Sequence, residues 1–231
     1  MAWVDRAKRA AVVKALEEVG DAQTIGIGSG STIEILVHEL AKRIGSRAFE
    51  LRLIPTSIQI EAAILKAGLR PVNPNEVSEI ELALDGADQV TPGSLDLIKG
   101  GGGALTREKI IDTAAREFVV VVDERKLTQT LGTAQSVPVE VIPFARRLVM
   151  AGIRRLGGKP ALKCGTNSIP FVTDNGNYVI DADFGPIQDP CRLEAQLKSM
   201  PGLVETGLFL GLTDRVYVGH KDGNVTVLEP T

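Results

Sequence analysis

The fold is decided by the stretch Thr-Ile-Gly-Ile-Gly-Ser-Gly-Ser-Thr at residues 24–32. Its first part, Thr24–Gly28, is a short apolar run with the pattern of a buried strand. After the Gly/Ser loop, apolar residues at positions 33, 36, 37, 40 and 44 repeat at the spacing of an amphipathic helix. A strand, a tight loop and a helix in this order are typical of a parallel α/β sheet.

The same alternation surrounds this stretch from residue 5 to residue 122. Parallel strands need crossover connections that cover the faces of their sheet, so the order predicts a Rossmann-like α/β domain with a parallel sheet. The predicted helices lie at 5–19, 57–67 and 105–116, and the predicted strands at 51–54, 80–84, 95–98 and 118–122.

The pattern changes near Leu131. Four strands and two helices follow, which suits a small α+β domain of the split-βαβ, ferredoxin-like type. The sequence predicts strands at 137–142, 161–163 and 203–208, helices at 145–156 and 191–199, and a hairpin at 169–182 with Asn175-Gly176 as a type I′ turn.

The end of the chain is expected to return to the first domain. Residues 215–219 and 225–228 have the pattern of a hairpin, and about fifteen residues are too few to form a core alone. We therefore expect a Rossmann-like catalytic domain made of residues 1–130 and 209–231, and a small α+β domain at 131–208.

Composition excludes several classes of function. The chain has 231 residues, enough for a sizeable core, and its formal net charge of −3 gives no basic surplus for nucleic acid or an anionic membrane. No apolar run approaches the roughly 18 residues of a membrane span, and no signal peptide is evident, so we expect a cytoplasmic protein. Two isolated cysteines and two distant histidines do not favour a disulfide framework or a His/Cys metal cage, but carboxylates leave Mg²⁺ open.

Residues 26–32 form a candidate phosphate-binding loop. The glycines leave the backbone open to a ligand, and Ser29, Ser31 and Thr32 add hydroxyl groups at a predicted helix N-terminus. The alternative is that Ser31 or Thr32 simply caps that helix. Neither a G-x-G-x-x-G spacing nor a P-loop lysine is present, so a phosphorylated small molecule fits better than a nucleotide.

A second cluster of polar residues lies at 85–109. Asp85 and Asp88 follow a predicted strand, and Lys99 runs directly into the glycines 100–103. Ligands of α/β sheets gather at the carboxyl ends of strands, and successive backbone N–H groups beside a lysine can bind an anion. Alternatively, Asp-Gly is an ordinary turn and Lys99 is a surface residue.

Three further residues have both a structural and a functional interpretation. Glu108 is a candidate catalytic base, although Thr-x-Glu near a helix start often reflects capping. Lys126 is able to meet a second anionic end of a ligand, or it is a solvated loop lysine. Lys8 is one charged residue on an amphipathic helix.

Taken together, these residues resemble the ribose-5-phosphate isomerase A family, in that family's order and over nearly the whole chain. The 85–109 block is the most specific segment. The other segments that carry the resemblance are Gly-Ile-Gly-Ser-Gly-Ser-Thr (26–32), Pro-Thr-Ser (55–57), Pro-Val-Glu-Val-Ile-Pro (138–143), Val-Thr-Asp-Asn-Gly-Asn (172–177) and Pro-Gly-Leu-Val-Glu-Thr-Gly-Leu-Phe (201–209).

The resemblance implies interconversion of D-ribose 5-phosphate and D-ribulose 5-phosphate through a cis-enediolate, in the non-oxidative pentose phosphate pathway, by a homodimer or homotetramer without metal or cofactor. Glu108 would be the base, and Asp85, Asp88 and Lys99 would bind the sugar hydroxyls, assist ring opening and stabilise the enediolate. The implied substrate-binding residues are Lys8, Gly28, Ser29, Gly30, Ser31, Thr32, Asp85, Gly86, Ala87, Asp88, Lys99, Gly100, Gly101, Gly102 and Lys126.

The chain departs from the family pattern at a few positions. Ser29 stands where many members have Thr, and Gln89 stands where the family commonly has Glu, which lowers the local negative charge. Two rival hypotheses remain at this point. The chain could be a non-catalytic sugar-phosphate sensor, or a CoA-transferase-like or sugar-phosphate deaminase-like enzyme, and the aspartate, lysine and glutamate set argues against both.

Overall fold

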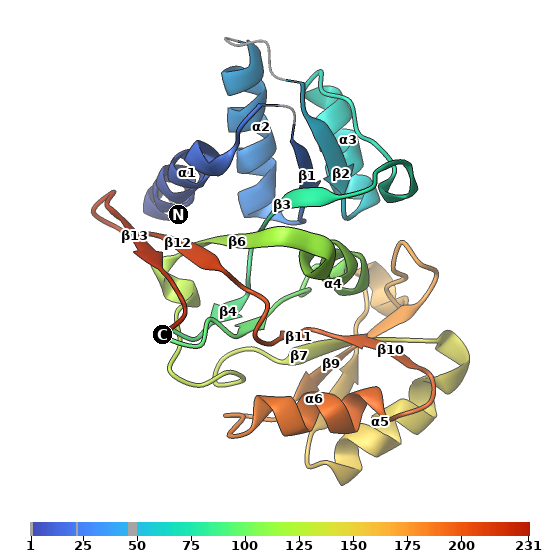
Figure 1. Ribbon diagram of the computed structural model, residues 1–231. Helices are drawn as coiled ribbons and strands as arrows, with labels where there is room; N and C mark the ends of the chain where they lie inside the picture. Colours follow the sequence, from blue (N-terminus) through green and yellow to red (C-terminus); the bar gives the residue numbers. More distant parts are fainter. Residues whose placement is uncertain (1, 22, 46–49) are drawn as a thin grey trace.

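The computed structural model describes residues 2–21, 23–45 and 50–231. Its largest sheet has six strands in the order β13-β12-β6-β3-β1-β2 (Figure 1). Neighbouring strands are parallel except β12 and β13, which form the predicted C-terminal hairpin and return to the first sheet. The strands are β1 (Thr24–Ile27), β2 (Arg52–Pro55), β3 (Ile80–Asp85), β6 (Ala115–Asp123), β12 (Arg215–Gly219) and β13 (Val225–Leu228).

Helices cover both faces of this sheet (Figure 1). On one face, Ile25 and Ile27 of β1 share a core with the first three helices. On the other face, a Cβ atom at Gly26 would lie 2.2 Å from Ile111 of α4, so the glycine permits close packing of that helix. The helices are α1 (Ala2–Ala15), α2 (Ser31–Gly45), α3 (Ile58–Lys66) and α4 (Leu105–Ala114).

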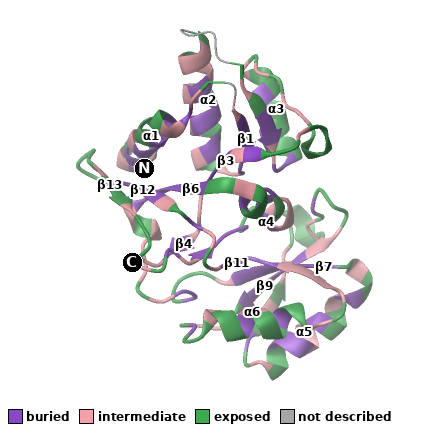
Figure 2. Cartoon of the chain, viewed as in Figure 1, coloured by how far each residue is buried: buried purple, intermediate pink, exposed green. Residues whose placement is uncertain are grey.

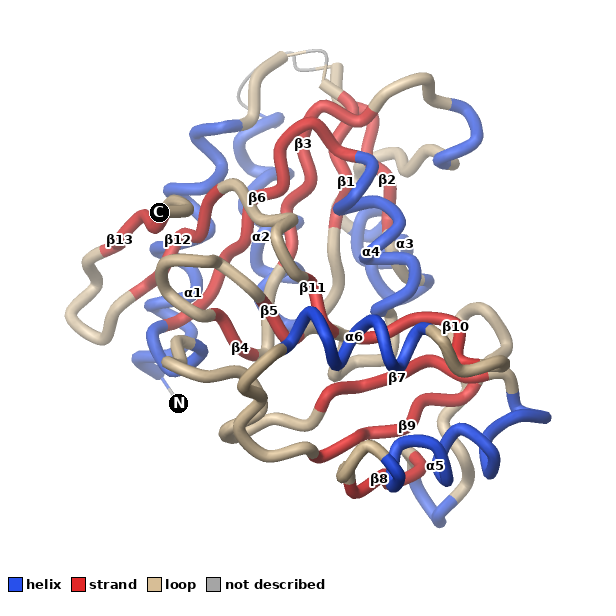
Figure 3. The backbone as a smooth tube through the Cα atoms, turned by 60° about the horizontal axis from the view of Figure 1, so that its bottom comes forward, coloured by secondary structure: helices blue, strands red, loops and turns tan. Residues whose placement is uncertain are grey.

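The second sheet has the ferredoxin-like order β10-β7-β9-β8 with every neighbouring pair antiparallel, as predicted. Two helices lie on one of its faces (Figure 3). Buried residues run along the inner strands of both sheets, whereas the edge strands β8 and β13 have none and α5 and α6 expose their outer sides (Figure 2). The elements are β7 (Val137–Val141), α5 (Arg146–Arg155), β8 (Lys159–Leu162), β9 (Tyr178–Asp183), α6 (Pro190–Lys198) and β10 (Leu203–Thr206).

A third, three-stranded sheet connects the two larger ones, and β4 in it was not predicted. Its strands are β4 (Gln89–Val90), β5 (Leu97–Ile98) and β11 (Leu208–Phe209), in the order β11-β5-β4. Leu97 packs into the core beneath the first sheet, and its neighbour Ile98 packs into the core of the second. This small sheet places Lys99, the residue that follows Ile98, between the two larger sheets.

Several predicted elements are wrong at their ends. The helix predicted over 5–19 stops at Ala15 and is followed by a 3-10 helix at Leu16–Glu18. The helix predicted over 105–116 stops at Ala114, because Ala115 already pairs with Ile80 in the parallel sheet. The strand predicted over 203–208 is interrupted at Gly207, whose N–H donates to Pro138 O and whose carbonyl accepts from Lys99 N. The strand predicted over 95–98 shortens to its last two residues, because Leu95 has a φ of 54°.

The hairpin predicted over 169–182 is wrong in its first half, where the chain makes only single bridges at Pro170 and Val172. The predicted type I′ turn fails because, of Asn175 and Gly176, only the glycine has a positive φ. The turn closes instead through a hydrogen bond from Gly176 N to Thr173 O. The segment is therefore an irregular loop that reaches away from its sheet.

The strands of the second sheet all lie within 131–208, and those of the largest sheet lie outside that range. The exact boundaries of the two domains stay a prediction. None of the described helices has the length and apolar character needed to cross a membrane.

Candidate active site

A cavity of about 320 Å³ lies at the carboxyl ends of the parallel strands. All of the predicted site residues line it except Gly28 and Asp85, which lie behind its wall. The structure therefore brings together residues from five separate segments of the chain. These are Lys8, the 29–32 loop, the 86–88 turn, the stretch 99–108 with Lys99, the glycine run and Glu108, and Lys126.

The cavity has further lining residues that were missed as site residues. Ser57 and Gln59 come from the start of α3, and Phe171, Val172 and Asp174 come from the loop before β9. Both segments fall partly within the stretches that carry the family resemblance, but no local pattern gives them a role. Gly103 and Ala104 complete the lining beside the predicted glycines.

Lys99 forms the centre of the site together with two carboxyl groups. Its Nζ lies 2.6 Å from Asp85 Oδ2 and 3.0 Å from Glu108 Oε2. Lys99 is 2% exposed, Asp85 0% and Glu108 3%. The ring of Phe209 lies on another side of the ammonium, with its centroid 5.0 Å from Nζ, which adds a cation–π contact.

Burial and mutual charge shift the pKa values of these groups. Burial raises the pKa of Glu108 to about 7, the charge of Asp85 adds to this effect, and Lys99 opposes it. Burial alone would lower the pKa of Lys99, but the charges of Asp85 and Glu108 outweigh it, so the pKa lies above its ordinary value. Burial likewise raises the pKa of Asp85 despite the nearby ammonium. Lys99 is therefore a lasting cation beside a carboxyl group that titrates near neutral pH.

The Asp85 carboxylate is held by the backbone as well as by Lys99. Its Oδ1 accepts hydrogen bonds from Gly86 N at 2.6 Å and Ser29 N at 3.2 Å. Asp85 is absent from the cavity lining, and its charged partner is Lys99, which does line the cavity.

Asp88 faces the cavity and is held by the glycine run. Its Oδ2 accepts a hydrogen bond from Gly101 N at 2.9 Å, and its Oδ1 lies 3.8 Å from Lys126 Nζ. Gly103 N donates to Gly100 O. Two of the four glycine N–H groups are thus used within the protein, so the predicted anion nest is only partly free.

Another part of the cavity lining is formed by the N-terminus of α2. Lys8 Nζ donates to Ser31 Oγ at 2.9 Å, which brings a positive charge to this helix end. The hydroxyl of Ser29 contacts Thr56 Oγ1 and Ser57 Oγ. A positive helix end with a lysine and free N–H groups is a site for an anion such as phosphate.

Gln89, the departure from the family pattern, does not line the cavity. Its Oε1 accepts a hydrogen bond from Gly132 N at 2.7 Å, and its side chain is buried. The residue therefore helps to attach the segment that leads to the second sheet, and it does not contact the titrating groups.

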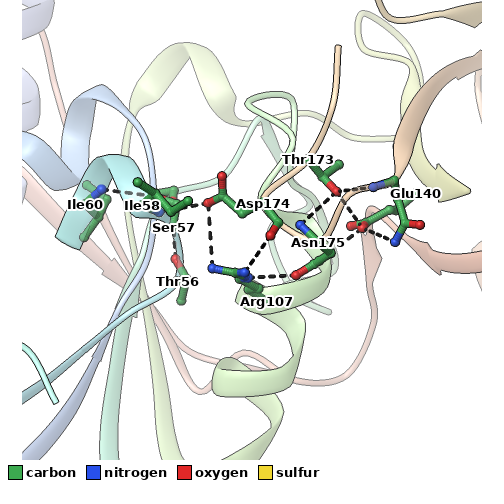
Figure 4. A network of polar contacts seen from close by, with 11 residues as sticks. Thr56, Ser57, Ile58, Ile60, Arg107, Glu140, Thr173, Asp174 and Asn175 are labelled. Atoms are coloured by element: carbon green, nitrogen blue, oxygen red, sulfur yellow. Dashed lines mark hydrogen bonds and ion pairs between the residues drawn. The ribbon is translucent and has the colours of Figure 1, made fainter. Parts of the chain in front are cut away.

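The loop of residues 171–177, called the strap below, spans the cavity from the second sheet to α3 (Figure 4). Asp174 Oδ2 accepts a hydrogen bond from Ile58 N, the first residue of α3, at 2.8 Å. Arg107, next to Glu108, donates to Asp174 O and to Asn175 Oδ1, both at 2.8 Å. The strap thus joins both larger sheets to the helix that carries Glu108.

Glu140 of β7 anchors the strap from the side of the second sheet (Figure 4). Its Oε1 accepts hydrogen bonds from Thr173 Oγ1, Asn175 Nδ2 and Asn177 Nδ2. Its Oε2 accepts one from Thr106 Oγ1 at the start of α4. A fully buried carboxylate with this many donors holds the strap and the start of α4 in one arrangement.

Within the described ranges, no three His, Cys, Asp or Glu side chains are arranged to hold a metal ion. A parallel sheet with a buried lysine and carboxyl groups at its strand ends, in one cavity with a positive helix N-terminus, defines an α/β enzyme of a small anionic substrate.

Comparison with known proteins specifies the family. Residues 52–223 match the family described as ribose 5-phosphate isomerase A (phosphoriboisomerase A). The chain is 43% identical to ribose-5-phosphate isomerase A of Methanosarcina acetivorans over 96% of this chain and 93% of that protein, and 45% identical to that of Natronomonas pharaonis over 94% of both.

Solved structures agree with this assignment. Ribose 5-phosphate isomerase A of Methanocaldococcus jannaschii superposes with a TM-score of 0.92 at 40% identity, over 96% of this chain and 98% of that one. A D-ribose-5-phosphate isomerase in complex with phospho-erythronic acid superposes with a TM-score of 0.94 at 38% identity, over 98% of this chain and 99% of that one. The chain therefore belongs to the ribose-5-phosphate isomerase A family, and it is an isomerase.

Proposed function

We propose that Glu108 is the base of an aldose–ketose isomerisation that interconverts D-ribose 5-phosphate and D-ribulose 5-phosphate. The observation that supports this most directly is a buried carboxyl group on the cavity wall whose pKa is about 7, 3.0 Å from a lysine ammonium. A base with a pKa near the working pH is suited to moving a proton between C2 and C1, and such a base contributes typically about 10²–10⁴-fold to the rate.

Lys99 stabilises the enediolate that forms when the proton leaves C2. Its ammonium lines the cavity and stays protonated, because Asp85 and Glu108 hold its pKa above the ordinary value. Loss of one such donor typically costs about 10²–10³-fold in kcat. Asp85 is a positioning residue, because it contacts Lys99 and not the cavity.

Asp88 is positioned to bind the sugar hydroxyls and to assist ring opening. It lines the cavity together with Glu108, whose pKa its charge helps to raise, and Gly101 N fixes one of its oxygens. The neighbouring Gly86, Gly100 and Gly102 let the sugar approach the backbone closely, and Ala87 lines the cavity beside them.

The phosphate binds on the 29–32 loop. Ser31 and Thr32 begin α2, so their N–H groups and the positive end of the helix face the ligand. Lys8 adds a formal charge there, and Lys126, whose Nζ lies 3.8 Å from Asp88 Oδ1, adds a second positive charge to the cavity lining. The cavity of about 320 Å³ suits a small ligand, because ligand pockets span about 300–1,000 Å³.

The rival hypotheses lose their support. A non-catalytic sensor, a CoA-transferase-like enzyme and a deaminase-like enzyme are each set aside by membership of an isomerase family over nearly the whole chain.

The proposal is tested by Glu108→Gln, with the exposed Glu61→Gln of α3 as the matched control. The Glu108 variant should lose isomerisation of ribose 5-phosphate by at least about 10²-fold. It should still bind phospho-erythronic acid in calorimetry, because the phosphate end is unchanged. The Glu61 variant should match the wild type in both measurements, and near-normal turnover in the Glu108 variant contradicts the assignment.

We further propose that copies of the chain assemble into a dimer or tetramer in the cytoplasm. Phe144 is 95% exposed and Leu148 is 71% exposed, and both lie near the start of α5 beside exposed Ile142. Neighbouring exposed apolar side chains support association. Light scattering should show more than one chain per particle. The double variant Phe144→Ser with Leu148→Ser should have fewer chains per particle than the wild type. A monomeric wild type contradicts the assembly, and recovery in a membrane or secreted fraction contradicts the location.

A further inference from the structure

Asp112 is a buried acidic residue that the mechanism above does not use. It lies on α4 one helical turn after Glu108, on the face of the helix that packs against the sheet, and it is 3% exposed. In the part of the chain that the structure describes, its Oδ2 has no hydrogen-bond partner. A buried carboxyl group of this kind is costly unless another group compensates it.

Three groups face Asp112 from the elements packed around it. The Asp85 carboxyl group at the end of β3 is within hydrogen-bonding contact of it. Lys99 from the end of β5 and Glu108 from α4 itself act on it through their charges. The ion pairs of Lys99 go to Asp85 and Glu108, so the ammonium is already shared between two other carboxyl groups.

The charges of this buried set limit how many protons it can lose. It contains three carboxyl groups and one ammonium, each nearly inaccessible to solvent. If all three carboxyl groups were ionised, two negative charges would remain uncompensated in a low-dielectric interior, which is strongly unfavourable. One proton on the pair of Asp112 and Asp85 removes one of these charges and turns a repulsive contact between two carboxylates into a hydrogen bond.

We propose that Asp112 is a positioning residue, a protonated acid whose O–H donates a hydrogen bond to the Asp85 carboxylate. Lys99 and two backbone N–H groups already hold Asp85, and this further donor would fix its orientation. Asp85 in turn fixes Lys99 beside Glu108. Burial, together with the charges of Asp85 and Glu108, raises the pKa of Asp112 well above its usual value, whereas Lys99 opposes the shift.

The protonation state has a consequence for Glu108. A neutral Asp112 adds no negative charge one turn away on the same helix, so the pKa of Glu108 remains close to neutral. An ionised Asp112 would raise it further and leave less of the base form at pH 7. This inference rests on the proposed function in one respect, the role of Glu108 as the base.

The first test compares Asp112→Asn with Asp112→Ala in kcat and KM across pH. The asparagine is neutral and keeps a donor, so kcat should stay within about threefold of the wild-type value. The acid limb of the profile of kcat against pH should stay within about 0.3 pH units of the wild-type limb. The alanine lacks the donor, so kcat should fall about tenfold or more while KM changes less. An acid limb displaced downward by half a unit or more in Asp112→Asn overturns the proposal, because a charge would then have been removed. So does wild-type kcat in Asp112→Ala.

The second test does not depend on turnover. An infrared difference spectrum of wild type minus Asp112→Asn at pH 7 should contain the carbonyl band of a protonated carboxylic acid. Its absence overturns the assignment of Asp112 even if Glu108 proves to be the base. If instead Glu108→Gln remains active while the band is present, the proposed function fails and the protonated Asp112 stands.

Discussion

Gly28 and Asp85 lie at adjacent strand ends, and the Asp85 carboxyl group fills the space that a side chain at position 28 would need. A Cβ atom on Gly28 would lie 1.9 Å from Asp85 Cγ. Asp85 is fully buried and lies 2.6 Å from Lys99 Nζ. This glycine, which the sequence pattern associates with ligand approach, therefore makes room for a buried carboxyl group of the candidate active site.

We expect Gly28→Ala to lower kcat by about 10²-fold, because it displaces Asp85 and with it Lys99, and a shift of about 1 Å in a catalytic group can have this effect. The matched control is Gly165→Ala, since that glycine has open space around it and lies outside the cavity. Steady-state kinetics, with circular dichroism to check folding, measure both. A folded Gly28→Ala protein with wild-type kcat would contradict this role of the glycine.

The rate of isomerisation should rise with pH through about 7. Burial raises the pKa of Glu108 to about 7, so the protonated, inactive form dominates below that pH and the base form above it. The pKa of Lys99 lies above its ordinary value, so its deprotonation should not limit the rate at moderately alkaline pH. A profile of kcat/KM against pH measures this. An acid limb near the ordinary value of 4.5 would show that burial does not shift the group.

Lys8→Ala should raise KM for ribose 5-phosphate by about tenfold with a smaller change in kcat, because it removes a charge from the phosphate end and not from the reacting end. Lys14→Ala on the same helix is the control, since Lys14 pairs with Glu17 away from the cavity. Added salt should raise KM more in wild type than in Lys8→Ala. Equal KM values for the two lysine variants would remove Lys8 from the phosphate site.

Asp174→Ala should raise KM by about tenfold, because the strap loses its hydrogen bond to the start of α3. Asp174→Asn keeps an accepting oxygen and should be affected less. Asp189→Ala is the control, since Asp189 accepts from Arg192 N at the start of α6, away from the cavity. It should lower stability by about 1 kcal/mol and leave KM unchanged. If Asp174→Ala and Asp189→Ala both changed only thermal stability and left KM unchanged, the strap would have no part in binding.

Local patterns predicted most elements but misjudged several of their ends. The strand–loop–helix unit at 24–44 was predictable because burial repeats with a period that neighbouring residues reveal. The end of α4 was not, because Ala115 leaves the helix for a pairing with Ile80, a residue distant in the sequence. The strand β4 was missed because two residues carry no periodicity.

The candidate site likewise has some residues that local sequence patterns reveal and others that only contacts between distant segments define. Lys99, Glu108 and the glycine run could be found because they lie together in one unusual segment. Asp112 lies in that helix too, yet nothing nearby in the sequence shows that it meets Asp85 in the interior. Asp174 reaches a helix that starts 116 residues earlier, and no local signal records such a contact.

By itself, the sequence determined two kinds of sheet and singled out the segment 85–109, because periodic burial and unusual residue combinations are local properties. Only the tertiary structure decided which groups lose their solvent. Enclosure between the two sheets brings Asp85, Lys99 and Glu108 together and raises the pKa of Glu108 to about 7. That shift depends on desolvation and on charges from three different elements, and it therefore exists only in the folded chain.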